Sequence, residues 1–167
     1  VDGGLMVAVN AIRSASATNS FISVTEDGKV AMFRTGGNPH CHVILRGGKS
    51  PNYDAASVAA CEEELQKAGL IENVMIDCSH GNSNKDHRNQ KLVLEEVAEQ
   101  INNGNKSIIG VMLESNLEEG NQPIPDDLSD LKYGVSITDA CIDWSTTETL
   151  LREFAGSLSE SLESRAV

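Results

Sequence analysis

The chain has 167 residues, of which 40% are hydrophobic, and this apolar content suits one globular core and excludes a disordered chain. Asp and Glu total 25 against 13 Lys and Arg, so the formal net charge is -12. Such a charge excludes general attraction to nucleic acid or to an anionic membrane surface, so any basic residue that matters must act locally.

The first part of the chain predicts a helix followed by a β-hairpin. Residues 5–12 carry apolar side chains at helical spacing. Residues 21–34 contain two runs of β-forming residues on either side of Asp27-Gly28. This dipeptide is a strong hairpin signal, because glycine takes a positive φ angle at little cost.

The middle of the chain alternates predicted strands and helices. Apolar runs at residues 41–46, 73–80 and 107–115 are typical of strands buried on both faces of a parallel sheet. Between them, residues 54–69 and 85–104 have helical spacing, and each segment ends at a glycine. Because this alternation requires neighbouring strands to run parallel, we expect an α/β fold in one domain.

The alternation stops after the third strand. Residues 116–134 contain two prolines and no apolar period, which predicts a long surface loop. Residues 135–144 predict an extended segment that returns toward the end of the third strand. Ser145 and Glu148 then form a capping-box pattern, which predicts the start of a final amphipathic helix.

The cysteines and the apolar runs indicate the cellular compartment of the protein. Four cysteines lack CxxC spacing and lie among small or apolar neighbours, which predicts buried free thiols: Cys41, Cys61, Cys78 and Cys141. No run approaches the ~18 apolar residues of a membrane span, and no signal peptide is visible. We therefore expect a cytoplasmic protein.

Polar residues end the three predicted strands at an equal spacing of 34 residues, at positions 46, 80 and 114. Arg46, His80 and Glu114 should therefore share the carboxyl edge of one sheet, where the chemistry of a (β/α) barrel takes place. The returning segment places Asp139 near the same edge. An imidazole and two carboxylates suit a divalent cation such as Mn, Fe, Co or Zn. Each residue alone would serve equally well as a cap or a loop anchor.

Arg46 permits two interpretations. A guanidinium at an open strand edge suits bidentate binding of a phosphate or a carboxylate, Gly47 and Gly48 permit close approach, and Lys49 adds a second positive charge. An internal ion pair explains Arg46 equally well, and Asp77 on the neighbouring strand is its obvious partner.

The segment at residues 79–90 is rich in Gly, Asn and Ser and leads from a strand into a helix. Such a segment can bind an anion through backbone N–H groups, but we favour an ordinary turn with a helix cap. His87 is expected on a solvated helix face.

Four long strings follow one another along the chain: HVILRGGKSPNYDA, VMIDCSHGNSNKD, IIGVMLESNLEEGNQ and LKYGVSITDACIDW. In this order they resemble segments of type I 3-deoxy-D-arabino-heptulosonate 7-phosphate (DAHP) synthase, the branch found in enteric bacteria and fungi, and the likeness covers nearly the whole chain. The resemblance implies that residues 1–167 are the C-terminal part of a (β/α)8 TIM barrel. This part would hold the last three barrel strands, their helices and, at residues 20–34, an inserted regulatory β-hairpin.

The resemblance also implies an activity. The family condenses phosphoenolpyruvate with erythrose 4-phosphate to give DAHP and phosphate, the first step of the shikimate pathway to aromatic amino acids. By resemblance, His80, Glu114 and Asp139 would bind the divalent metal. Arg46, His80 and Asp139 would be catalytic, and these three residues and Lys49 would bind substrate.

Regulation and assembly are implied in the same way. Phe21 and Ser23 would line a pocket for an aromatic amino-acid inhibitor, and a homo-oligomer is expected, because an open set of barrel strands favours pairing with another chain.

Part of the family's pattern precedes the matched region, including a fourth metal ligand, a cysteine, and most of the basic substrate contacts. Since a whole barrel needs ~250 residues, we expect a piece of a longer enzyme that is inactive alone. Two alternatives are an octulosonate 8-phosphate synthase-like enzyme and a metal-dependent aldolase. A third is a non-catalytic half-barrel that binds aromatic amino acids or assembles with partner chains.

Overall fold

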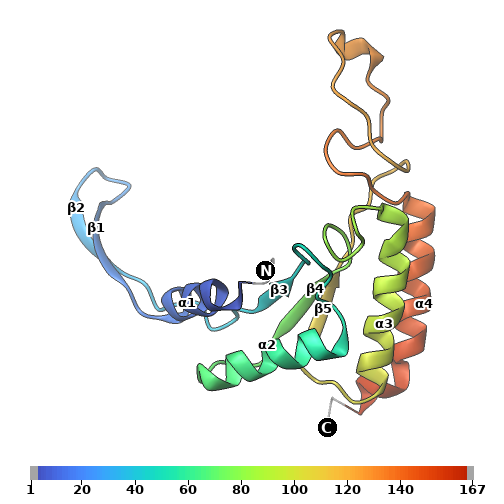
Figure 1. Cartoon of the computed structure of the whole chain (residues 1–167). Coiled ribbons are helices and arrows are strands. Elements are labelled where there is room, and N and C mark those ends of the chain that lie inside the picture. The colour runs from blue at the N-terminus through green and yellow to red at the C-terminus, as the bar shows by residue number, and fades with distance from the viewer. Residues whose placement is uncertain (1–3, 165–167) are drawn as a thin grey trace.

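A computed structural model describes residues 4–164, which form an α/β body and a projecting hairpin (Figure 1). The body has three strands and three long helices that alternate along the chain: β3 (Val43–Leu45), α2 (Ala55–Lys67), β4 (Val74–Asp77), α3 (Gln90–Asn102), β5 (Ile108–Met112) and α4 (Trp144–Glu163). The strands pair in the order β3-β4-β5, and both pairings are parallel. The predicted parallel α/β arrangement is therefore confirmed.

Local sequence signals determine where α2 and α3 begin and end. The Asp54 side chain caps α2 by accepting a hydrogen bond from the Ser57 N–H. Gly69 and Gly104, just beyond the ends of these two helices, take φ angles of 67° and 99°, which an L side chain rarely adopts. Both predicted stops are therefore confirmed. A short 3₁₀ helix, η1 (His87–Asn89), precedes α3.

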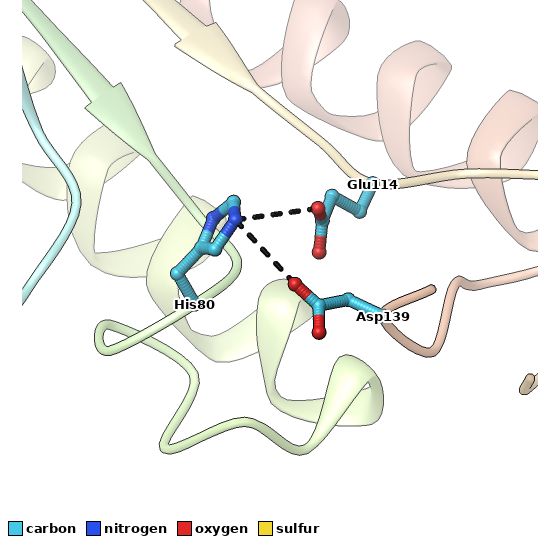
Figure 2. A group of neighbouring side chains, drawn as sticks. All are labelled: His80, Glu114 and Asp139. Atoms are coloured by element: carbon cyan, nitrogen blue, oxygen red, sulfur yellow. Dashed lines mark ion pairs between the residues drawn. The ribbon is translucent and has the colours of Figure 1, made fainter. Parts of the chain in front are cut away.

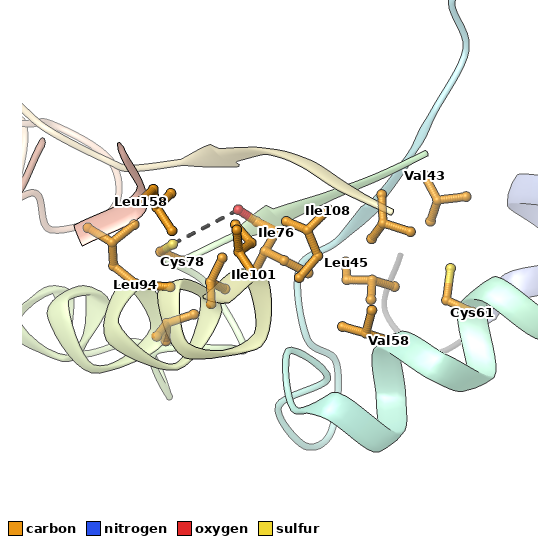
Figure 3. Packing of buried hydrophobic residues seen from close by; sticks show 14 of the residues in the cluster. Val43, Leu45, Val58, Cys61, Ile76, Cys78, Leu94, Ile101, Ile108 and Leu158 are labelled. Carbon is orange, nitrogen blue, oxygen red and sulfur yellow. Dashed lines mark hydrogen bonds between the residues drawn. The ribbon is translucent and has the colours of Figure 1, made fainter. Parts of the chain in front are cut away.

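The core lies on one face of the sheet. Alternate strand residues on this face are buried in the described structure: Val43, Leu45, Val74, Ile76 and Ile108. They meet apolar side chains from α2, α3 and α4, including Val58, Cys61, Leu94, Ile101 and Leu158 (Figure 3). The strand residues between them are covered less completely: Ile44 and Met75 are half-buried. The expectation of burial on both faces is therefore wrong for the described residues, because the three helices all cover the same side.

Helix α4 starts earlier than predicted. Its N-cap is Asp143, whose side-chain oxygen accepts a hydrogen bond from the Thr146 N–H (2.7 Å). Ser145 already lies inside the helix and donates its hydroxyl to Asp143 (3.0 Å). The predicted capping box at Ser145 is therefore wrong, because the carboxylate that precedes it satisfies the free N–H of the first turn.

The hairpin stands away from the sheet and follows helix α1 (Leu5–Ser16) (Figure 1). Strands β1 (Ser20–Val24) and β2 (Val30–Arg34) pair antiparallel, and Gly28 in the turn has φ 75°. The hairpin predicted from Asp27-Gly28 is confirmed.

The segment at residues 116–134 is a long loop that extends beyond the sheet (Figure 1) and contains one short 3₁₀ helix, η2 (Leu128–Asp130). Isolated bridges tie the chain here to the extended segment that follows: Ser115 with Ile142, Gly120 with Cys141 and Asn121 with Ser136. The predicted loop is confirmed. The extended segment predicted at residues 135–144 is confirmed only in part, because it forms isolated bridges with bends between them and Trp144 already belongs to α4. None of the helices formed by residues 4–164 has the length and apolar content needed to cross a membrane.

Candidate metal and anion site

Three of the predicted residues converge at the carboxyl edge of the sheet (Figure 2). His80 follows β4, Glu114 follows β5, and Asp139 lies in the returning extended segment. The His80 Nε2 atom is 3.4 Å from Glu114 Oε1 and 3.7 Å from Asp139 Oδ2. One ligand atom from each side chain lies within 4.8 Å of the other two, which is a spacing that one cation can bridge.

The cluster is accessible from one side. The side chains of His80 and Glu114 are 23% and 27% exposed, whereas that of Asp139 is 71% exposed. The first two are therefore held by the body, while Asp139 closes the cluster from the solvent side. One imidazole nitrogen and two carboxylates are donors that suit a first-row divalent ion.

The free cysteines do not take part in this cluster within the described residues. Cys61, Cys78 and Cys141 are buried, as predicted, whereas Cys41 is half-buried. Cys141 is near the cluster in sequence, and its Sγ contacts the backbone oxygen of Asp139 (3.6 Å). Burial raises the pKa of the Cys141 thiol, and the negative charges of Glu114 and Asp139 add to this shift.

Asp77 is the buried partner of His80. Its Oδ2 atom is 2.8 Å from His80 Nδ1, and its Oδ1 atom accepts hydrogen bonds from the Ser79 N–H (2.9 Å) and the Ser79 hydroxyl (2.7 Å). Its side chain is only 4% exposed. The alternative interpretation of Arg46, an ion pair with Asp77, is therefore wrong, because nearer donors already occupy both oxygens of this carboxylate.

Arg46 is exposed and forms no ion pair within residues 4–164. Its side chain lines a cavity of about 570 Å³ that the candidate metal ligands also line. The walls include Arg46, Gly47, Gly48, His80, Lys85, His87, Glu114 and Asp139. Lys49 is exposed and is not among the lining residues. The described structure thus leaves the Arg46 guanidinium available to an anion in the same cavity as the cluster.

Two glycines bring Arg46 and His80 to the same cavity. A Cβ atom on Gly47 would lie 2.5 Å from the Gly81 carbonyl carbon, and one on Gly81 would lie 2.7 Å from that of Gly47. The Gly81 N–H also donates to the Arg46 oxygen (3.0 Å). Backbones this close require glycine on both sides, so the loops after β3 and β4 are packed together.

The buried Asn82 side chain links the same loops through hydrogen bonds. It is 2% exposed, and its amide nitrogen donates to the backbone oxygens of Leu45 (3.0 Å) and Asp77 (2.8 Å). Its side-chain oxygen accepts from the Asn52 N–H (2.8 Å). The segment at residues 79–90 is therefore an internally bonded turn that leads into η1 and α3, as favoured from the sequence.

Some lining residues were missed. Lys85, in the turn after β4 with φ 62°, provides a second cation in the cavity. The side chain of His87 is 13% exposed, and its Nε2 atom is 2.8 Å from Glu119 Oε1. The predicted solvated position of His87 is wrong, because this contact with the 116–134 loop turns the ring inward. The only sequence signal for Lys85 and His87 as lining residues was their place in the segment that follows a strand.

The hairpin residues proposed for an effector lie elsewhere. Phe21 stacks on Phe33, with ring centroids 5.9 Å apart, and its residue is 50% exposed. Ser23 is exposed, pairs with Ala31 and lies on the same face of the hairpin as Phe21. Their strands, β1 and β2, stand away from the strands β3, β4 and β5 in Figure 1.

The fold and the cluster together define a parallel α/β protein with potential metal ligands at the carboxyl ends of its strands. Comparison with known proteins narrows this class. The chain belongs to the DAHP synthetase I family, whose model matches residues 2–152. The resemblance found in the sequence is therefore confirmed.

Individual relatives agree. The chain is 55% identical over 164 residues to the Tyr-sensitive phospho-2-dehydro-3-deoxyheptonate aldolase of Salmonella typhimurium, covering 98% of this chain and 46% of the relative. It is 52% identical over 157 residues to the Phe-sensitive phospho-2-dehydro-3-deoxyheptonate aldolase of Escherichia coli K12, and this match covers 94% of this chain and 45% of the relative. The solved structure of a phospho-2-dehydro-3-deoxyheptonate aldolase from Francisella tularensis superposes on this chain with a TM-score of 0.84 at 45% identity. The match covers 95% of this chain and 46% of that one. The chain thus spans about half the length of these relatives.

Proposed function

We propose that this chain provides the metal-binding half of a DAHP synthase, which condenses phosphoenolpyruvate with erythrose 4-phosphate and releases phosphate. The observation that carries the proposal is the convergence of His80, Glu114 and Asp139 on a cavity that Arg46 also lines. Potential metal ligands share this cavity with a guanidinium that has no ion pair among residues 4–164, which is what a Lewis-acid site and an anionic substrate require. Membership of the family points to the same reaction.

We infer that the chain, over residues 1–167, is the C-terminal part of a (β/α)8 barrel. The strand order β3-β4-β5 runs in one direction, and α2, α3 and α4 all pack on the same face. In a doubly wound sheet the order reverses and helices cover both faces, whereas a barrel keeps its helices on the outside. The hairpin at residues 20–34 is then an insertion before the first of these strands.

The donor set fits a divalent metal of the Mn, Fe, Co or Zn type, held by His80 Nε2 and by carboxylate oxygens of Glu114 and Asp139. When bound, such a metal supplies a Lewis acid that polarises the aldehyde oxygen of erythrose 4-phosphate. The chain's own part is to orient the substrates. Because Asp139 is largely exposed, it is the ligand best placed to adjust as substrate enters.

Arg46 is proposed to bind the phosphate of phosphoenolpyruvate. Its guanidinium makes no ion pair within the described residues, and Lys85 in the same cavity adds a second positive charge. These local cations matter in a chain whose net charge is -12, since the overall field repels an anionic substrate. Lys49 lies outside the cavity lining, so we assign it at most a contact from the rim.

We propose that the hairpin binds an aromatic amino-acid inhibitor. Relatives of this chain are named Tyr-sensitive and Phe-sensitive. Phe21 and Ser23 share one face of the hairpin with Phe33, so an aromatic ring and a hydroxyl are available there. Calorimetry with Phe and Tyr should show binding that the Phe21→Ala change weakens, and equal affinity in the two proteins would contradict this site.

The activity test measures phosphate release from phosphoenolpyruvate and erythrose 4-phosphate by the protein in its complete natural form. We expect activity that a chelator abolishes and Mn restores, and that is lost in His80→Ala and Glu114→Ala. The Arg46→Ala change should raise the KM for phosphoenolpyruvate far more than it lowers kcat. Arg152→Ala is the matched control, because Arg152 pairs with Glu148 on the exposed side of α4.

Three results would contradict the proposal: full turnover without metal, an unchanged KM in Arg46→Ala, or a preference for arabinose 5-phosphate as the acceptor. The last result would indicate an octulosonate 8-phosphate synthase-like enzyme. The 167-residue chain alone is expected to release no phosphate.

A further inference from the structure

We propose that Asp77 is a positioning residue that fixes the ring tautomer of His80 and so presents Nε2 as the atom that binds metal. The inference rests on the metal site proposed above and adds a residue that is not itself a ligand. It is carried by the contacts of a carboxylate that is almost fully buried next to the cluster.

The hydrogen-bond directions around Asp77 are determined by its partners. Oδ1 accepts from both the N–H and the hydroxyl of Ser79, at 2.9 and 2.7 Å. Oδ2 lies 2.8 Å from His80 Nδ1. Since a carboxylate only accepts hydrogen bonds, the proton of this last contact belongs to the Nδ1 atom of the imidazole. The Ser79 hydroxyl, 2.7 Å from Nδ1, gives its own proton to Asp77 and therefore does not compete as a donor.

A proton on Nδ1 leaves the lone pair of a neutral imidazole on Nε2. This is the atom that faces Glu114 and Asp139, at 3.4 and 3.7 Å. The opposite tautomer would direct an N–H group into the cluster and block the coordination position.

The Asp77→Asn change tests this mechanism with almost no change in shape. The two donors of Ser79 require an acceptor, so the amide oxygen should take the place of Oδ1. The NH₂ group must then face His80 Nδ1 and donate to it. This reverses the tautomer and places the proton on Nε2, where it opposes metal binding.

The experiment has two readouts. The first is the tautomer of the neutral His80 ring in metal-free protein labelled with ¹⁵N-histidine, observed by NMR. We expect Nδ1–H in the parent protein and Nε2–H in Asp77→Asn. The second is Mn affinity measured by electron paramagnetic resonance, which should fall about 10- to 100-fold in Asp77→Asn.

Asp54→Asn is the matched control. Asp54 likewise accepts from the N–H and the hydroxyl of one serine, Ser57, but it caps α2 away from the cluster. This variant should keep both the parent tautomer and the parent Mn affinity. A merely structural role of Asp77 would lower the melting temperature without reversing the tautomer.

The outcomes separate this inference from the metal site itself. Nε2–H in the parent protein overturns the inference even if Asp77→Asn fails to fold. An unchanged tautomer and affinity in folded Asp77→Asn overturns it as well. A parent protein that shows Nδ1–H yet binds no Mn supports the tautomer assignment and overturns the proposed metal site.

Discussion

Cys78 shows how the position of one residue sets its chemistry. It follows β4 on the helix-covered face, and burial, assisted by the charge of Asp77, raises the pKa of its thiol to about 12. Burial likewise raises the pKa of Cys61 to about 11. The reactive form of cysteine is the thiolate, and a raised pKa lowers the thiolate fraction at any given pH. Both residues therefore act as small apolar side chains of the core.

The difference in burial between Cys41 and these two cysteines predicts the order in which the thiols are alkylated. At about pH 8, iodoacetamide should modify the half-buried Cys41 first and leave Cys61 and Cys78 unmodified until the protein unfolds. Even near pH 10, Cys61 and Cys78 should stay mainly in the unreactive thiol form, because burial raises their pKa values to about 11 and about 12. Peptide mass spectrometry with and without urea measures the order, and early labelling of Cys78 in folded protein would contradict it.

At the scale of the elements, the loops after β3 and β4 act as one unit. Gly47 has φ 72° and lies against the backbone of Gly81, so neither loop can shift without the other. This contact holds Arg46 and His80 on the same cavity, although they belong to different βα units. The relative placement of the proposed anion-binding and metal-binding groups is thus decided by backbone packing.

The Gly47→Ala change should therefore destabilise the protein by more than the ~1–3 kcal/mol that a non-glycine residue at positive φ usually costs, since its Cβ also meets backbone. Gly156→Ala is the matched control: this glycine is exposed in α4, nothing would lie within 4 Å of the added Cβ, and the change should stabilise by ~0.5–1 kcal/mol. Urea unfolding measures both free energies of unfolding. Equal effects in the two variants would show that the glycine contact does not constrain the loops.

At the scale of the whole molecule, the hairpin projects from the α/β body (Figure 1), and apolar side chains on it are uncovered in the described structure. Ile22, Val24, Val30 and Met32 lie on one hairpin face by their pairing, and they are 59–76% exposed in the described structure. A two-stranded hairpin is at best marginally stable on its own, and an apolar patch of this kind marks an interface. We therefore infer that another chain, or another part of the protein, covers this face.

The expected consequence is association of this chain into a species heavier than its 17.9 kDa monomer. The double change Ile22→Lys and Met32→Lys should shift the sedimentation mass toward the monomer, because two charges would be buried without partners. Ile71→Lys is the control, since Ile71 is a similarly exposed apolar residue just beyond α2. If the double variant keeps the parent mass, the face is not the interface.

Much of this architecture follows from local signals. The glycines after α2 and α3, the Asp27-Gly28 turn and the alternation of apolar runs predicted the elements that the structure shows. The equal spacing of Arg46, His80 and Glu114 predicted a shared edge, because strands in one parallel sheet end on the same side. The helix ends and the turn depend on a few neighbouring residues, and the shared edge depends only on the order of strands and helices, so the sequence alone determined them.

Tertiary structure decided which side chains pair. Asp77 contacts His80 rather than Arg46, and His87 turns inward to meet Glu119, 32 positions along the chain. The Asp77–His80 contact spans three positions and depends on the turn after β4, where His80 has φ 50°, whereas the His87–Glu119 contact depends on how two loops pack; apolar period and strand spacing predict neither. A hydrogen bond acts over about 3 Å, so partners distant in sequence are determined only when the folded backbone brings their loops together.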